Sequence, residues 1–225
     1  NYPRQATKMF NVFAKAAPSP FAPEGRDLLL MKVGVQGKVI GREGRKPAHL
    51  VLVVDASGSM AKPDRMPLVQ YALEQLVGQL APGDRVSLVT YGPSAELRLE
   101  AVTAQNKQQI VAAIRDIRCS GSTNLLEGLT LGYSVAQNAF APGQTNRVIL
   151  CSDGVANIGA VDAQQMLTRV ESFRKQGITF TSVGFGVGTY NDQVLEELAN
   201  KGDGSYVFVD SQEEARRIFV DRFNA

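Results

Sequence analysis

The chain has 225 residues, of which 44% are hydrophobic and 20% are charged, so it can bury a sizeable core and is not a disordered chain. Its 24 basic and 22 acidic residues give a formal net charge of +2 without a concentrated basic segment, which argues against a nucleic-acid-binding protein. The longest apolar runs, such as residues 50–54, are too short to span a membrane.

The chain begins with two short regions of different character. Residues 1–26 show no clear periodicity and are rich in proline, so we interpret them as a linker or the tail of a preceding region. Residues 27–46 alternate apolar with polar or glycine residues and end in a charged, glycine-rich stretch, which is typical of an edge strand and a turn. We assign the main domain to residues 47–225.

From residue 47 onward, buried strands alternate with amphipathic helices. The predicted strands cover residues 50–54, 86–91, 148–151, 180–185 and 206–209. The predicted helices cover residues 69–80, 110–117, 125–140, 166–173 and 191–201, and a last helix opens at Ser211. This alternation predicts a doubly wound α/β domain with a mainly parallel central sheet and helices on both faces.

Polar residues gather where the predicted strands end, which is where ligands bind to open α/β sheets. Asp55, Ser57 and Ser59 follow the first buried strand, and Asp153 follows the strand at residues 148–151. Thr123 lies in a glycine-flanked loop before a helix. Two carboxylates and three hydroxyls without an imidazole favour a hard cation such as Mg²⁺, Mn²⁺ or Ca²⁺ over zinc.

These residues resemble the metal-ion-dependent adhesion site of von Willebrand factor A domains, over roughly residues 48–223. The flanking sequences HLVLVVDASGSM, GSTNL, VILCSDGVANIG and TSVGFGVGTYND are similar to a bacterial A-domain family found between an N-terminal extension and a further C-terminal domain. The resemblance implies that Ser57, Ser59 and Thr123 are direct ligands. It implies that Asp55 and Asp153 act largely through water, and it favours the bacterial cell envelope.

We therefore expect a non-enzymatic binding module. Its Mg²⁺, with Mn²⁺ or Ca²⁺ as alternatives, would coordinate an Asp or Glu of a protein partner, without nucleic acid or membrane insertion. Asp64 and Arg65 would rim the metal face, where a partner would touch them. A structural domain that docks flanking domains of the same chain is one alternative. A metal-dependent hydrolase is another, and it would need a general base near the ion.

Three other motifs suggest different enzymes. Residues 59–62 fit the S-x-x-K motif of penicillin-recognising serine enzymes, with further echoes at residues 152–154 and 175–177, but the last of these closes a helix. A phosphoaspartyl transferase would need an aspartate where the chain has Ser57. The glycines of residues 184–188 resemble the start of a G-x-G-x-x-G dinucleotide-binding loop, but residue 189 is Thr where that motif has its last glycine. We expect these glycines instead to let the end of a strand pass close to the site loops.

Cysteine, histidine and asparagine residues near these loops allow simpler interpretations. Cys119 and Cys151 either form a disulfide that joins two site loops or remain part-buried thiols. We interpret His49 as a strand-edge residue. Asn124 should hold its loop through side-chain hydrogen bonds to the backbone.

Overall fold

The structure, a computed structural model, describes residues 10–24, 26–37, 45–154, 160–186 and 192–221. The chain divides into two compact units, one ending at Arg45 and one formed by Lys46–Phe223. No helix among the described residues has the length and apolar character needed to cross a bilayer.

The first unit contains a two-stranded antiparallel ribbon. β1 (Phe10–Pro18) pairs with β2 (Leu29–Gly37), with Val12 opposite Val35 and Asn11 opposite Gln36. Residues 1–26, which show no clear periodicity in the sequence, contain the strand β1, which was not predicted. Its pattern of period two is carried partly by alanine and lysine, which are weak β-strand formers.

The two faces of this ribbon differ in character because side chains alternate across a strand. Val12 and Val35, on one face, are 64% and 67% exposed. On the other face Lys15 lies opposite Lys32. The first face, here called the apolar ribbon face, consists of Phe10, Val12, Ala14, Ala16, Pro18, Leu29, Met31, Val33, Val35 and Gly37.

The second unit is built on a six-stranded sheet with the order β5-β4-β3-β6-β7-β8. All neighbouring strands are parallel except β5, which runs antiparallel to β4 at one edge. The strands are β3 (Ala48–Asp55), β4 (Arg85–Tyr91), β5 (Ala95–Thr103), β6 (Thr145–Ser152), β7 (Ile178–Phe185) and β8 (Tyr206–Val209). The predicted mainly parallel sheet is confirmed, whereas β5 was not predicted.

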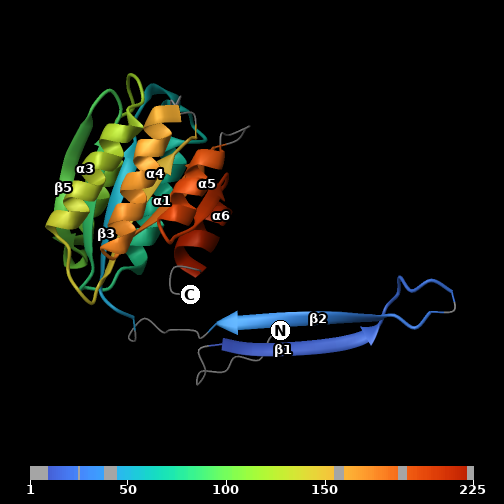
Figure 1. Cartoon of the computed structure of the whole chain (residues 1–225). Helices are drawn as coiled ribbons and strands as arrows, with labels where there is room; N and C mark the ends of the chain where they lie inside the picture. The colour runs from blue at the N-terminus through green and yellow to red at the C-terminus, as the bar shows by residue number, and fades with distance from the viewer. Residues whose placement is uncertain (1–9, 25, 38–44, 155–159, 187–191, 222–225) are drawn as a thin grey trace. The chain divides into compact units, whose positions relative to one another are not determined.

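Helices cover both faces of the sheet, as the sequence predicts (Figure 1). They are α1 (Met66–Gln79), α2 (Lys107–Arg115), α3 (Leu125–Asn138), α4 (Ala160–Lys175), α5 (Asp192–Lys201) and α6 (Gln212–Arg216), with short 3₁₀ segments η2 (Gly58–Ala61) and η3 (Ala104–Asn106) and the π-helical η4 (Arg217–Asp221). Leu52 and Val54 of β3 pack with residues of α1, α2 and α6. Val51 and Val53 pack on the opposite face with residues of α3, α4 and α5.

Two glycines allow α3 to lie close against the sheet. A Cβ atom on Gly132 would lie 2.4 Å from Val53 Cγ2, and one on Gly128 would lie 2.6 Å from Tyr91 Cγ. These distances are shorter than van der Waals contact, so neither position has room for a larger side chain. The position of α3 matters because its N-terminal turn follows the loop that contains Thr123.

Buried polar residues hold the opposite, amino-terminal edge of the central strands. Asp84, which is fully buried, accepts hydrogen bonds from the backbone N–H groups of Ala48 (2.9 Å) and Ala81 (2.7 Å). His49 is also fully buried, with Nε2 3.0 Å from Ser87 Oγ, and burial lowers its pKa to about 4. His49 is therefore a core residue of a central strand, which corrects the strand-edge interpretation.

Candidate metal centre

Four loops meet at the carboxyl edge of the central strands: those after β3, β4 and β6, and the one before α3. The Ala56 N–H donates to the Tyr91 carbonyl (2.7 Å), and the Ser120 N–H donates to the Ala56 carbonyl (2.8 Å). The Asn124 N–H donates to the Gly92 carbonyl (2.8 Å). These backbone bonds fix the loop before α3 against the loops that follow β3 and β4.

Asp55 ends β3 and is completely buried. Its Oδ1 accepts the Ser57 N–H (2.9 Å), and its Oδ2 accepts the hydroxyls of Tyr91 (3.3 Å) and Ser152 (3.2 Å). Burial raises the pKa of Asp55, the bonds from Ser57 oppose this shift, and the charge of Asp153 adds to it. The carboxylate therefore lies where an added positive charge would stabilise its ionised form.

The two serines of the D-x-S-x-S motif lie beside each other. Ser57 is 1% exposed, and its Oγ is 3.1 Å from the Oγ of the half-buried Ser59. Between them, the Gly58 N–H donates to the Gly121 carbonyl (2.9 Å), and a Cβ on Gly58 would lie 3.2 Å from that oxygen. The small residue between the serines thus allows close approach of the loop that contains Thr123.

Thr123 is partly exposed and immediately precedes the N-cap of α3. The N-cap Asn124 accepts the Glu127 N–H through its side chain (3.2 Å) and donates to Glu127 Oε2 (2.9 Å). Glu127 Oε1 in turn accepts the Ala95 N–H (3.1 Å). The expectation that Asn124 holds its loop through a side-chain hydrogen bond to the backbone is confirmed. These hydrogen bonds fix the turn that contains Thr123.

Asp153 follows β6 and is 1% exposed. Its Oδ2 accepts a hydrogen bond from Nη1 of Arg65, which also donates to the Ser59 carbonyl (3.0 Å). Arg65 is only 8% exposed, so the expectation that it rims the metal face was wrong. Arg65 instead joins the loop after β3 to the carboxylate after β6.

Sequence analysis missed one residue of this region, Tyr91, and one contact, that of Arg65 with Asp153. Arg65 is separated from Asp153 by 88 positions, and no local pattern connects them. Tyr91 ends a strand in register with Asp55, so its polar tip at the carboxyl end of an apolar strand is a signal that could have been used.

The von Willebrand factor type A domain family matches residues 49–221 of this chain. The chain belongs to that family. A domains are generally protein-interaction modules, and many bind a divalent cation at the adhesion site.

Other proteins are similar to this chain in sequence or in fold. The uncharacterized protein YfbK of Escherichia coli is 34% identical over 197 residues, which cover 88% of this chain and 34% of that protein. A solved structure of a von Willebrand factor type A protein from Catenulispora acidiphila has a TM-score of 0.68 at 16% identity and covers 98% of this chain and 51% of that one. The chain thus spans about a third of the length of YfbK and 45% of that of a Synechocystis relative.

A third similar protein is proximal thread matrix protein 1 of the mussel byssus, whose structure has a zinc-occupied MIDAS motif. Its TM-score is 0.63 at 21% sequence identity, with 80% of this chain and 46% of that chain covered. At this identity the similarity establishes only that the two proteins share a fold. The bound zinc is a property of the mussel protein.

The donor set of this A domain suits a hard cation. Among the residues that the structure describes, no group of three or more His, Cys, Asp or Glu side chains could hold a metal ion. A cation at the candidate centre would therefore depend on hydroxyl oxygens as well as on Asp55 and Asp153. Oxygen donors of this kind, with few anions, fit Mg²⁺ or Mn²⁺ that retains bound water.

The lysines of the other motifs give no support to a serine enzyme, although Ser59, Ser152 and Asp153 of these motifs lie at this edge of the A domain. Lys175, in the K-T-G-like sequence, pairs with Glu171 of the same helix at 3.3 Å, and Lys62 is exposed. A Cβ on Gly184 would lie 2.8 Å from the Tyr206 hydroxyl, so this glycine makes room for β8 rather than for a site loop. The end of the glycine-rich stretch, Gly188, lies outside the described residues.

Cys119 and Cys151 are free thiols, so the alternative of a disulfide between the two site loops was wrong. Burial raises the pKa of both thiols, that of Cys151 to about 12. Both therefore remain protonated and poorly nucleophilic at neutral pH.

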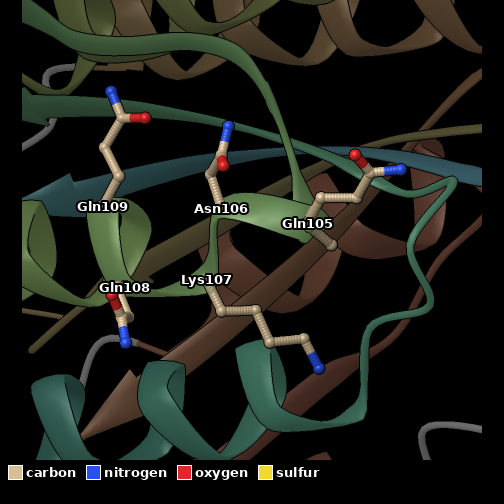
Figure 2. Close-up of a pocket in the computed structure, with 6 residues that line it drawn as sticks. Gln105, Asn106, Lys107, Gln108 and Gln109 are labelled. Carbon is tan, nitrogen blue, oxygen red and sulfur yellow. The ribbon is translucent and has the colours of Figure 1, made fainter.

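A separate hollow lies on the surface at η3 and the start of α2, lined by residues 104–109. Figure 2 shows that the side chains of Gln105, Asn106, Lys107, Gln108 and Gln109 point in different directions around it. Lys107 Nζ donates a hydrogen bond to the Gly78 carbonyl at 2.9 Å. Because its polar groups do not converge, we do not regard this hollow as a binding site.

Proposed function

We propose that this A domain binds a protein partner through a divalent cation, Mg²⁺ or Mn²⁺, at the carboxyl edge of its sheet. Ser57, Ser59 and Thr123 would hold the ion directly, with Asp55 and Asp153 acting largely through water. When bound, the cation offers a coordination position to an Asp or Glu carboxylate of the partner.

The observation that supports this proposal most strongly is the burial of two aspartates at the carboxyl edge of the sheet, beside two neighbouring serine hydroxyls. Asp55 and Asp153 are each at most 1% exposed, although buried carboxylates are unfavourable unless they are compensated by charge. The raised pKa of Asp55, due mainly to burial, is a further sign of a carboxylate that lacks enough positive charge. A cation supplies that charge and gives the hydroxyls a common partner.

The first test is calorimetric titration of MnCl₂ and MgCl₂ into the metal-stripped chain. We expect one cation per chain, and we expect Thr123→Ala to weaken its binding by about tenfold or more, since one oxygen ligand is lost. Ser122→Ala is the matched control, because it removes an exposed hydroxyl from the same loop. Equal affinity in Thr123→Ala and the wild type would contradict the assignment of Thr123.

The open coordination position can be tested with acetate as a carboxylate probe. Acetate should lower the water-proton relaxation produced by protein-bound Mn²⁺, because it replaces a bound water molecule. Acetamide, which is neutral and similar in shape, is the control. If neither probe changes the relaxation, the ion has no position for an acidic partner.

A second function, docking to other parts of a longer polypeptide, is favoured by the apolar ribbon face. An isolated two-stranded ribbon is marginally stable in water, and an exposed apolar face of this extent normally has a partner. We propose that further β-strands of the same polypeptide cover it, since YfbK and the Synechocystis relative have more than half of their length outside the matched region.

A solved structure of a larger protein is similar to more of this chain than the Lys46–Phe223 unit. The Lys46–Phe223 unit comprises 79% of the 225 residues, whereas the likeness to the Catenulispora structure covers 98% of this chain and only 51% of that larger one. Residues before Lys46 therefore have counterparts within a larger fold. The division at residues 26 and 46 that the sequence suggests remains a prediction.

Paired lysine substitutions test the role of the apolar ribbon face. The 225-residue chain should be monomeric in sedimentation and should enhance the fluorescence of the apolar dye ANS, and Val12→Lys with Val35→Lys should remove most of that signal. Asn11→Lys with Gln36→Lys, a directly opposed pair on the other face, should leave it. A dimer that the valine variant dissociates would instead assign the face to a second copy.

A further inference from the structure

A buried guanidinium lies within the candidate metal centre. The side chain of Arg65 is 10% exposed, and its residue immediately precedes α1. Nη1 donates both to the Ser59 carbonyl, at 3.0 Å, and to Asp153 Oδ2. The charged guanidinium of Arg65 therefore lies between the Ser59 carbonyl and the Asp153 carboxylate. These groups belong to the loops after β3 and β6, which would also hold the proposed cation.

The contacts of Arg65 are those of a cation and not of a packing residue. Carbonyl and carboxylate oxygens are the groups that hard cations bind, and Nη1 is directed at one of each. The Arg65 Nε atom is buried without a hydrogen-bond partner among the described residues. A buried donor without a hydrogen-bond partner lowers the stability of the folded protein. That the chain has an arginine here despite this loss indicates a role for its charge.

The charges around Arg65 explain what that role is. The hydrogen-bond donors that the structure gives to the Asp55 carboxylate are uncharged, namely the Ser57 N–H and the hydroxyls of Tyr91 and Ser152. With both aspartates ionised, the pair together with Arg65 carries one net negative charge. Addition of a divalent cation changes that sum to one net positive charge.

We propose that Arg65 is a resident cation of this centre, which competes with the divalent ion for Asp153 and gives the loaded centre a net positive charge. This inference rests on the proposed function and adds a residue that sets the cation affinity. In the metal-stripped protein the guanidinium neutralises part of the buried negative charge. In the loaded protein the extra positive charge favours an anionic ligand, such as a carboxylate, over a neutral one.

The test is calorimetric titration of MgCl₂ into the full 225-residue chain and three variants. Arg65→Gln retains hydrogen-bond donors but removes the charge, and it should bind Mg²⁺ about tenfold more tightly than the wild type because a nearby like charge is lost. Arg65→Lys retains the charge and should stay close to the wild type. Lys62→Gln removes an exposed charge three positions away and should change nothing.

The outcomes separate this inference from the proposed function. Unchanged or weaker Mg²⁺ binding by folded Arg65→Gln overturns the role of Arg65, while binding by the wild type still supports the metal centre. Binding by Arg65→Gln but not by the wild type supports competition and rejects a metal-dependent function of the natural chain. Binding by neither protein overturns both.

A measurement on the wild-type chain removes any dependence on how well Arg65→Gln folds. In arginine-labelled protein, the side-chain N–H resonance of Arg65 should shift when MgCl₂ is added, because Nη1 loses or weakens its bond to Asp153 Oδ2. Resonances of exposed arginines such as Arg118 serve as the internal control. An unchanged Arg65 resonance at a Mg²⁺ concentration that saturates binding would overturn the proposal.

Discussion

Asp55→Ala should abolish the stabilisation of this A domain by divalent cations. In the wild type, millimolar Mg²⁺ or Mn²⁺ at about a hundredfold excess over its dissociation constant should add about 2.7 kcal/mol to the free energy of unfolding. For a chain of this size that corresponds to a rise in Tm of roughly 5–10 °C. Thermal unfolding of metal-stripped protein with and without the ion measures the effect directly.

The size of the expected loss follows from the contacts of Asp55. Its carboxylate holds the Ser57 N–H and the hydroxyls of Tyr91 and Ser152, so its removal takes away a negative charge and also releases three groups that shape the centre. The baseline Tm of Asp55→Ala combines lost hydrogen bonds with relief of a buried charge, which act in opposite directions. The rise produced by the cation is therefore the diagnostic quantity.

Asp84→Ala provides a matched control for Asp55→Ala. Asp84 is also completely buried and accepts two backbone N–H groups, but it precedes β4 and so lies at the opposite edge of the sheet. Its removal should lower the baseline Tm while the rise with Mg²⁺ persists. A cation response that survives in Asp55→Ala, or one that disappears in Asp84→Ala, would contradict the proposed metal centre.

Gly128→Ala should destabilise the domain although it places a better helix former within α3. Helix propensity alone predicts a gain of up to about 1 kcal/mol. The new Cβ, however, would lie 2.6 Å from Cγ and 2.9 Å from Cβ of the buried Tyr91, so the body of the ring has to move. Overpacking of this kind costs about 1–3 kcal/mol, and we expect a net loss in the free energy of unfolding measured by urea denaturation.

Displacement of Tyr91 also has a consequence for the centre, because its hydroxyl donates to Asp55 at 3.3 Å. Gly128→Ala should therefore weaken Mg²⁺ binding as well as stability. Gly78→Ala is the control, since Gly78 lies in α1 with no atom near its missing Cβ, and this variant should be as stable as the wild type or more so. Equal stability of the two alanine variants would show that α3 can move away from β4.

The candidate centre was predictable from sequence to the extent that it depends on strand ends. A buried apolar run followed at once by Asp55, Ser57 and Ser59 indicates both the strand and the groups that leave its carboxyl end. The same reasoning located Asp153 after β6. Thr123 was located differently, from the glycines that flank its loop and the helix that follows, because this loop follows an α-helix and not a strand; its role as a direct ligand came from the resemblance.

Edge elements were harder to predict than central ones. β5 alternates clearly between apolar and charged residues, but it lies at the edge of the sheet beside β4, outside the regular strand–helix pattern. β1 carries its alternation partly on alanine and lysine, and the apolar ribbon face that it forms with β2 appears only when the two strands are brought into register.

The sequence by itself determined the doubly wound architecture and the identity of the oxygen-rich loops, because both follow from periodicity and from residues that adjoin a strand. Only the tertiary structure decided which groups surround the two buried carboxylates. The Tyr91 hydroxyl reaches Asp55 from the neighbouring strand, and Arg65 reaches Asp153 across 88 positions of the chain. Such contacts depend on how separate elements pack, and the low-dielectric surroundings that make their charges important exist only after the helices have covered the sheet.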